Sequence, residues 1–266
     1  MSARRNVTRE HPAVAVSGPV TAEESAYAQR VIGDVLATVD HAAERLRARL
    51  SPYGGYDTTA FTVVAQVNVA VRARMIRVQT AAPTVREAIE QAAAGLLLRL
   101  HRLDQHLAAE RSGDVGFVAG EWCSPYPQSP IGLAGPRTAA GRIVRMKDYH
   151  LAVQTPDSAA FAMDLRDYPF HLFVDDATGG DALVHRDGAT GYSLHRSVPA
   201  PAPAGLTVPL TIQRWPAVPM ALARAVQLLN AAPDRRFLFF TDPRSRRARV
   251  LYRRFDGQFG LLAPAW

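Results

Sequence analysis

The feature that most constrains the fold of this 266-residue chain is an internal repeat. When the sequence is shifted by 66 residues against itself, similar residues fall on one another from residue 149 onwards. The matched positions are Tyr149 and Trp215, Ala159 and Ala225, Leu172-Phe173 and Leu238-Phe239, Asp176 and Asp242, Val184 and Val250, and, after a one-residue gap, Tyr192 and Phe259. Two copies indicate a duplicated small domain and not a solenoid, which needs at least three units.

The two copies span residues 142–196 and 210–266, and a Pro- and Ala-rich segment at 197–209 joins them. Each copy has about 55 residues, which is near the lower limit for an independent hydrophobic core. Units this small often complete their core by pairing with another copy. Because the second copy is in the same chain, we predict an intramolecular pseudo-dimer of two small α+β modules, and therefore a monomer. Within the second copy, Pro219 is expected to open the helix.

Residues 11–110 predict a separate α+β domain with the element order β-α-β-β-β-α and both helices on one face of the sheet. Each helix follows a capping box, in which a Thr is followed three residues later by a Glu. The two boxes are Thr21 with Glu24 and Thr84 with Glu87. Residues 111–141 are rich in Gly, Pro and Ser, have no periodicity, and are expected to be a linker.

Residues 43–50 alternate between basic and apolar side chains, which predicts a strand with one basic and one buried face. The basic positions are Arg45, Arg47 and Arg49. Residues 51–56 are expected to form a turn, and residues 59–78 two further strands with a turn near 68–71. The second of these strands is expected to carry Arg72, Arg74 and Arg77.

The net charge of +7 is unevenly distributed along the chain. Residues 112–209 contain seven basic and ten acidic residues, whereas residues 210–266 contain ten basic and three acidic residues. Opposite charge on two copies favours their pairing. Thirty of the 31 basic residues are Arg, whose planar guanidinium binds phosphate through two hydrogen bonds.

No arrangement of residues predicts catalysis, a metal site or a cofactor. Asp175-Asp176 fits the composition of a turn better than a pair of catalytic carboxylates. Cys123 is a single cysteine, so it has neither a disulfide partner nor a Cys-x-x-Cys motif. No apolar run reaches the ~18 residues that a transmembrane helix needs. We see no signal peptide, and we expect a cytoplasmic protein that does not bind membranes and is not an enzyme.

The basic residues are better candidates for function, because phosphate neutralisation dominates affinity for nucleic acids. An α+β platform with a basic face suggests RNA, since duplex RNA is recognised mainly by shape and backbone. The candidate rRNA-binding residues are Arg45, Arg47, Arg49, Arg72, Arg74, Arg77, Arg86, Arg99 and Arg102. A second basic patch consists of Arg244, Arg246, Arg247, Arg249, Arg253 and Arg254. This patch either complements the acidic first copy or binds a polyanion, and the sequence leaves both roles open.

Several segments of the two copies resemble the C-terminal module of the long-form ribosome hibernation promoting factors. The segments are Ile143-Val144-Arg145-Met146-Lys147, Pro219-Met220, and the run Tyr252-Arg253-Arg254-Phe255-Asp256-Gly257-Gln258-Phe259-Gly260-Leu261. The element order of residues 11–110 is similar to the ribosome-binding domain of that family. The resemblance implies binding to the small ribosomal subunit at the decoding channel, against rRNA and neighbouring ribosomal proteins. Translation would stop, as part of a stress or dormancy response.

The chain departs from the family pattern because its C-terminal module is duplicated. The resemblance implies that in ordinary long forms this module homodimerises and joins two ribosomes. If the two copies in this chain satisfy each other, we expect single ribosomes to be silenced and not paired. Two other classes of function stay open: a protein–protein adaptor that uses the repeats, and an RNA-processing accessory protein or enzyme. Adaptor binding is expected to be less salt-sensitive than binding through many phosphates.

Overall fold

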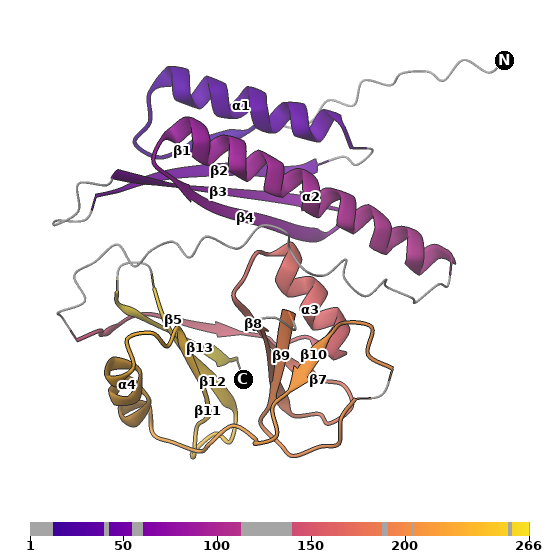
Figure 1. The fold of residues 1–266 in the computed structure, drawn as a ribbon, viewed down its shortest axis with the longest axis vertical. Helices are drawn as coiled ribbons and strands as arrows, with labels where there is room; N and C mark the ends of the chain where they lie inside the picture. The colour runs from indigo at the N-terminus through magenta and orange to yellow at the C-terminus, as the bar shows by residue number, and fades with distance from the viewer. Residues whose placement is uncertain are drawn as a thin grey trace. The chain divides into compact units, whose positions relative to one another are not determined.

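The computed structural model describes residues 13–39, 43–54, 61–112, 140–187, 191–203, 205–254 and 257–265 (Figure 1). It contains two compact units. Among the described residues, unit 1 holds the N-terminal sheet and its helices together with the short segment Leu165–Asp167, and unit 2 holds nearly all of the two repeat copies. No helix in the described part of the chain is long and apolar enough to cross a membrane.

Unit 1 has the β-α-β-β-β-α order that the sequence predicts. Its elements are β1 (Ala15–Ser17), α1 (Ala22–Ala37), β2 (Ala43–Gly54), β3 (Phe61–Val71), β4 (Arg74–Ala82) and α2 (Val85–Ser112). The strands form one sheet in the order β1-β2-β3-β4, in which β1 runs parallel to β2 and the other neighbours are antiparallel. Both helices cover the same face of this sheet (Figure 1). The opposite face, which we call the open face, carries no helix, and within the unit its Arg77 side chain contacts the backbone carbonyls of Arg166 and Asp167.

Helix α1 begins at the expected capping box. The hydroxyl oxygen of Thr21 accepts a hydrogen bond from the backbone N–H of Glu24, and the Glu24 carboxylate accepts one from the backbone N–H of Thr21. The apolar stripe of α1 buries Ile32 and Leu36, and α2 buries Leu96 and Leu100 in the same core. Alternate residues of β2 are buried beneath them, which leaves the intervening arginines on the open face.

Two sequence predictions in unit 1 are wrong. Residues 51–54 continue strand β2 and do not form a turn. The turn between β3 and β4 lies at Arg72 and Ala73, not at residues 68–71, so Arg72 lies outside the strand that it was predicted to occupy. Both residues have positive φ angles, of 48° and 59°. Tight hairpins need this conformation, which Asn-Gly usually supplies, and Arg-Ala carries no such signal.

Unit 2 contains both repeat copies except for residues 165–167. The first copy forms β5 (Ile143–Tyr149), β6 (Val153–Gln154), α3 (Pro156–Leu165), β7 (Phe170–Asp175), β8 (Asp181–Asp187) and β9 (Gly191–Arg196). The second copy forms β10 (Leu210–Ile212), α4 (Leu222–Ala231), β11 (Phe237–Thr241), β12 (Ala248–Arg253) and β13 (Phe259–Pro264). Helix α4 starts at Leu222, and Pro219 instead forms an isolated bridge with Thr241. The prediction that Pro219 opens this helix is therefore wrong.

The two copies exchange their first strands. The sheets have the orders β10-β9-β8-β7-β6 and β11-β12-β13-β5. Strand β5 of the first copy therefore pairs in parallel with β13 of the second copy, and β10 of the second copy pairs in parallel with β9 of the first (Figure 1). Each sheet is completed by a strand from the other copy, so the two modules are joined by backbone hydrogen bonds on both sides.

A shared hydrophobic core lies between the two sheets. Its buried members come from both copies: Phe170, Leu172 and Leu183 from the first, and Ala248 and Val250 from the second. The ring centroids of Phe170 and Phe237 are 5.2 Å apart. The predicted pseudo-dimer is therefore present, and its core is common to the two modules.

The contacts across this core follow a pseudo-two-fold axis. Phe170 pairs with His185 in one hairpin and Phe237 pairs with Tyr252 in the other, so equivalent strand residues are 67 positions apart. Phe170 contacts Tyr252, with ring centroids 5.7 Å apart, and the symmetry-equivalent contact joins Phe237 to His185 at 5.1 Å. Such reciprocal contacts are the mark of an isologous interface, here formed within one chain.

The structure corrects the alignment of the copies. Helices α3 and α4 begin and end 66 residues apart, but the strands that follow are equivalent at a spacing of 67 residues. The one-residue gap therefore lies between the helix and the first hairpin strand, and not after Val184 as the sequence comparison placed it. The difference matters because a shift of one residue moves every strand side chain to the opposite face.

We predict that Phe170→Ala destabilises unit 2 by about 3–5 kcal/mol, since it removes a buried aromatic ring from the shared core. The measurement is urea unfolding of the full chain followed by tryptophan fluorescence. Val153→Ala is the control: Val153 is 69% exposed, so its truncation should change the unfolding free energy by no more than about 0.5 kcal/mol. Equal losses in the two variants would contradict a core shared at Phe170.

Candidate nucleic-acid interface

The open face of unit 1 carries a row of arginines on strand β2, which we call the β2 arginine row: Arg45, Arg47 and Arg49. All three are exposed, and none of their side chains makes a hydrogen bond or ion pair with any residue that the structure describes. Alternate residues of a strand lie about 6.6–6.8 Å apart on one face. The row therefore offers three uncommitted guanidinium groups at a spacing close to that of successive phosphates in a nucleic-acid strand.

Polar side chains of the neighbouring strands extend this surface. Arg47 is in register with Asn68 of β3, which in turn is in register with Arg77 of β4. The Arg77 guanidinium donates hydrogen bonds to the amide oxygens of Gln66 and Gln79, so it is held in place by its neighbours. Arg74 lies at the start of β4 and Arg72 in the preceding turn. The open face is thus a polar, basic surface on which Arg77 is held by two side-chain amides and by the backbone carbonyls of Arg166 and Asp167.

Helix α2 carries the remaining rRNA-binding candidates, and they are not equivalent. Arg86 is exposed, contacts Glu90 in an ion pair of 3.2 Å and lies over the ring of Tyr27. Arg102 is only half-buried. These two side chains lie on the helical layer, whereas the β2 arginine row lies on the open face of the sheet.

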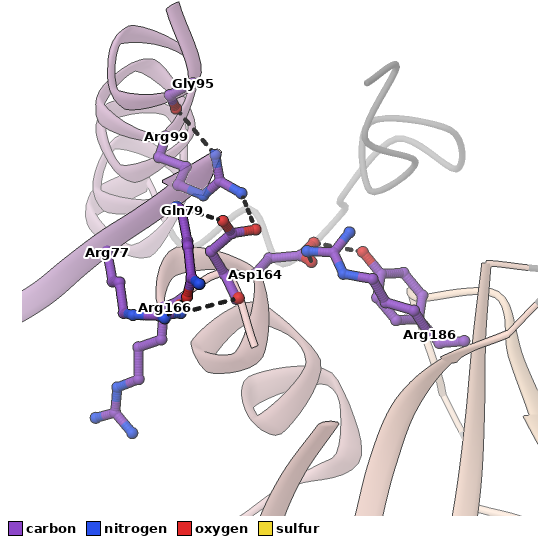
Figure 2. A network of polar contacts seen from close by, with 9 residues as sticks. Arg77, Gln79, Gly95, Arg99, Asp164, Arg166 and Arg186 are labelled. Atoms are coloured by element: carbon purple, nitrogen blue, oxygen red, sulfur yellow. Dashed lines mark hydrogen bonds and ion pairs between the residues drawn. The ribbon is translucent and has the colours of Figure 1, made fainter. Parts of the chain in front are cut away.

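Arg99 is buried, with only 8% of the residue exposed. Its guanidinium donates one hydrogen bond to the carbonyl of Gly95 at 3.1 Å and forms an ion pair of 2.5 Å with Asp167, another residue of unit 1 (Figure 2). The other Asp167 carboxylate oxygen accepts a hydrogen bond from the backbone N–H of Gln79 at 2.8 Å. Arg99 therefore has structural contacts within unit 1, unlike the β2 arginine row.

The second basic patch divides into structural and exposed arginines. Arg247 forms a two-pronged ion pair with Asp181 of the first copy, with 2.9 Å between Nη2 and Oδ1 and 2.9 Å between Nε and Oδ2. Hydrogen bonding to Asp181 raises the pKa of Arg247. Arg249 pairs with Asp242 within the second copy. The patch thus contributes one arginine to pairing between the copies, which is one of the two roles that the sequence left open, and one to its own turn.

The other members of the patch differ in exposure. Arg253 donates a hydrogen bond to the carbonyl of Leu229 at 2.7 Å and lies over the ring of Phe259. Arg254 follows it at the end of β12, where its backbone N–H donates a hydrogen bond to the carbonyl of Gln258. The side chains of Arg244 and Arg246 are exposed, and the positive charge of Arg244 lies close enough to Asp242 to help lower the pKa of that carboxyl, after the larger effect of the hydrogen bond from the Arg244 backbone N–H. These two arginines are the exposed members of the patch, and their side chains form no hydrogen bond within the described ranges.

Two buried carboxylates of the first copy have structural partners within that copy. Asp175, which ends β7, forms a buried ion pair of 2.7 Å with Arg196. Asp164 accepts a hydrogen bond from the hydroxyl of Tyr192 and pairs with Arg186 (Figure 2). The residues that the structure describes contain no group of three potential metal ligands. Cys123 lies outside the described residues.

A pair of histidines at the shared core was missed by the sequence analysis, which did not single out His195. The Nε2 atoms of His185 and His195 are 2.9 Å apart, and the His195 ring lies edge-on to Phe239 of the second copy. Burial, helped by the nearby His185, lowers the pKa of His195 from 6.5 to about 4. Burial also lowers the pKa of His185. Both imidazoles are thus favoured in their neutral form in the folded protein.

Comparison with known proteins defines the family. Residues 138–194 match the family model described as "Sigma 54 modulation/S30EA ribosomal protein C terminus". Over 270 residues the chain is 33% identical to the "Dormancy associated translation inhibitor" of Mycobacterium tuberculosis, in strains CDC 1551 / Oshkosh and ATCC 25618 / H37Rv. That alignment covers 96% of this chain and 90% of the relative.

A structural comparison aligns 36% of this chain with 99% of the Thermus thermophilus Protein Y N-terminal domain, with a TM-score of 0.28 and 15% sequence identity. The C-terminal module places the chain among proteins with the sigma 54 modulation/S30EA module, and the resemblance to long-form hibernation factors is thereby confirmed. The chain belongs to the family of the mycobacterial dormancy associated translation inhibitor.

We predict that unit 2 loses stability as the pH falls from 6.5 towards 4. The folded pKa of His195 lies below its unfolded value, so between these two values the unfolded chain binds more protons and gains stability relative to the folded chain. The expected loss is on the order of 1–3 kcal/mol. The measurement is urea unfolding at a series of pH values.

His195→Leu is the matched variant, because Leu262 occupies the equivalent position in the second copy. Its unfolding free energy should vary less with pH in this window than that of the natural sequence. An identical pH dependence in the two proteins would exclude His195 as the source.

Proposed function

We propose that this protein is a ribosome hibernation factor that binds the small subunit and blocks translation. Unit 1 would contact rRNA at the decoding channel, together with neighbouring ribosomal proteins, and the ribosome would be kept inactive and intact. The protein would act in the cytoplasm by occupying its site and not by catalysis. The name of the mycobacterial relative, a dormancy associated translation inhibitor, supports both the inhibition of translation and a role in dormancy.

The β2 arginine row is the observation that carries this proposal. Its side chains are exposed and have no partner among the described residues, so they concentrate positive charge on one face, and the resulting potential favours the binding of a polyanion there. The helices cover the opposite face of the sheet and contribute its hydrophobic core, so the open face is available for a ligand. Guanidinium groups at strand spacing suit the phosphates of an RNA backbone.

We further propose that the protein holds single ribosomes and does not join two of them. The support is the strand-exchanged arrangement of unit 2, in which each sheet is completed by a strand of the other copy. The apolar face that a lone module would offer to a second chain is covered by the partner copy in the same chain. A protein with its pairing faces occupied in this way would stay a monomer.

We expect Arg47→Glu/Arg49→Glu to weaken binding to purified small subunits at least tenfold, because it replaces two phosphate-binding cations by anions. The slope of log Kd against log salt concentration should also fall by roughly 0.7–0.9 for each phosphate that the variant no longer neutralises. The control is Arg30→Glu/Arg111→Glu, which makes the same change of charge on the helices of the same unit, at two exposed arginines outside the candidate set. Equal weakening by both variants would show that only net charge matters and that the open face is not the interface.

Sedimentation of ribosomes with the protein through a sucrose gradient tests the single-ribosome proposal. We expect the protein to migrate with single ribosomes and no ribosome-dimer peak to appear. A dimer peak that depends on the protein would mean that the modules pair between chains. Protein that stays at the top of the gradient at low salt would overturn ribosome binding altogether.

A further inference from the structure

Asp181 is the principal buried charge at the pairing interface of unit 2. Its side chain is 4% exposed, and both of its carboxylate oxygens contact the other copy. Oδ2 accepts a hydrogen bond from the backbone N–H of Ala248 at 2.7 Å, and both oxygens accept from the guanidinium of Arg247. The carboxylate is therefore satisfied entirely by the second copy.

Asp181 and Ala248 are equivalent positions of the two copies. Each is 11 residues beyond the first residue of the preceding strand, Phe170 in one copy and Phe237 in the other. Because they contact each other, this contact lies at the pseudo-two-fold axis. At an isologous interface between identical modules, a residue on the axis would meet its own copy. Here the duplication allows two different residues to meet.

The residues at the pseudo-two-fold axis disfavour pairing between two copies of the same module. Two first copies facing each other would bring two Asp181 carboxylates together in a buried site with no arginine. Two second copies would bring two Arg247 side chains together with no carboxylate, and the N–H of Ala248 would lose its acceptor. A buried charge without its partner is strongly destabilising, and so is an unpaired buried N–H.

The apolar contacts cannot make this distinction. Phe170 meets Phe237, its own equivalent, so a like pair would place one phenylalanine against another in much the same way. Leu183 and Val250 are likewise equivalent, and both are apolar. Discrimination between a like and an unlike module therefore depends on polar side chains, as in other interfaces where charges select the partner.

We propose that Asp181 and Arg247 determine which modules pair: each module accepts an unlike module and rejects a copy of itself. The surface of the first copy is a binding site for a module with Arg at the position of Arg247, and the nearest such module is the second copy of the same chain. Tethering gives that module an effective concentration far above that of any free chain, so the pairing closes within the monomer.

Two single charge reversals test this proposal in the full chain. Asp181→Arg places two arginines at the axis, and Arg247→Asp places two aspartates there. In each single variant the two copies carry like charges at the axis, so the charged side chains are left without a partner. Each single variant should therefore melt at a lower temperature than the natural sequence. The double variant Asp181→Arg/Arg247→Asp restores opposite charges within one chain, so it should be a monomer with a higher melting temperature than either single variant.

The decisive measurement is the mass of an equimolar mixture of the two single variants, by sedimentation velocity. The first copy of each variant is complementary only to the second copy of the other, so the mixture should form a heterodimer of twice the monomer mass. The matched control is Arg249→Asp mixed with Asp181→Arg, because Arg249 pairs with Asp242 within its own copy, and this mixture should not form the heterodimer.

A mixture that stays at monomer mass overturns the proposal. A double variant as unstable as the two single variants also overturns it, even if those variants fold poorly. The experiment contains no ribosomes, so its outcome is independent of whether the protein binds the small subunit. Failure of the pairing rule and failure of the ribosome-binding proposal are thus observed separately.

Discussion

The apolar contact between the sheets of the two copies is the interaction on which unit 2 depends. Each copy has one small helix to cover one face of its sheet, and the other face is covered only by the partner copy. The exchange of β5 and β10 adds backbone hydrogen bonds to this contact, so neither sheet is complete without a strand of the other copy. A module of about 55 residues gains in this way the core that its size does not provide.

The two copies have diverged where the shared core allows it. In the first copy, Asp164 near the end of the helix forms an ion pair with Arg186 and accepts a hydrogen bond from Tyr192. In the second copy Asn230 stands at the equivalent helix position and exchanges hydrogen bonds with the backbone of Gly141, 2.8 Å from the Gly141 nitrogen. An interface within one chain permits such divergence, because each side of it is encoded separately and can change without altering the other.

Repetition, capping boxes and strand alternation let the sequence predict the element order of unit 1, the two modules and their pairing. These signals are local or periodic, and the structure contains them where the residues indicate. The turn at Arg72 and Ala73 was misplaced because its positive φ angles are imposed by the adjoining strands and not by turn residues. The strand exchange was beyond prediction, since parallel pairing between β5 and β13 leaves no pattern in either strand.

The candidate binding residues also divide into those whose surroundings the sequence indicated and those whose surroundings it did not. Alternation placed Arg45, Arg47 and Arg49 on the solvent-exposed side of β2, and they are exposed. The sequence could not separate Arg247 from Arg244 and Arg246, because their difference lies in a contact with Asp181, 66 residues away. The burial of Arg99 was not visible in the sequence for the same reason: helical spacing describes a face, but not what lies against it.

The strand exchange has a consequence for synthesis of the protein. Strand β5 leaves the translating ribosome early, yet its partner β13 follows more than 100 residues later. Until β13 emerges, the first module lacks its partner sheet and keeps an apolar face exposed, whereas all four strands of unit 1 have already emerged. Such long-range pairing is slow because distant segments must meet. Unit 1 is thus able to fold during translation, and unit 2 completes its fold only near the end of synthesis, when a chaperone that covers apolar surface would be most useful to it.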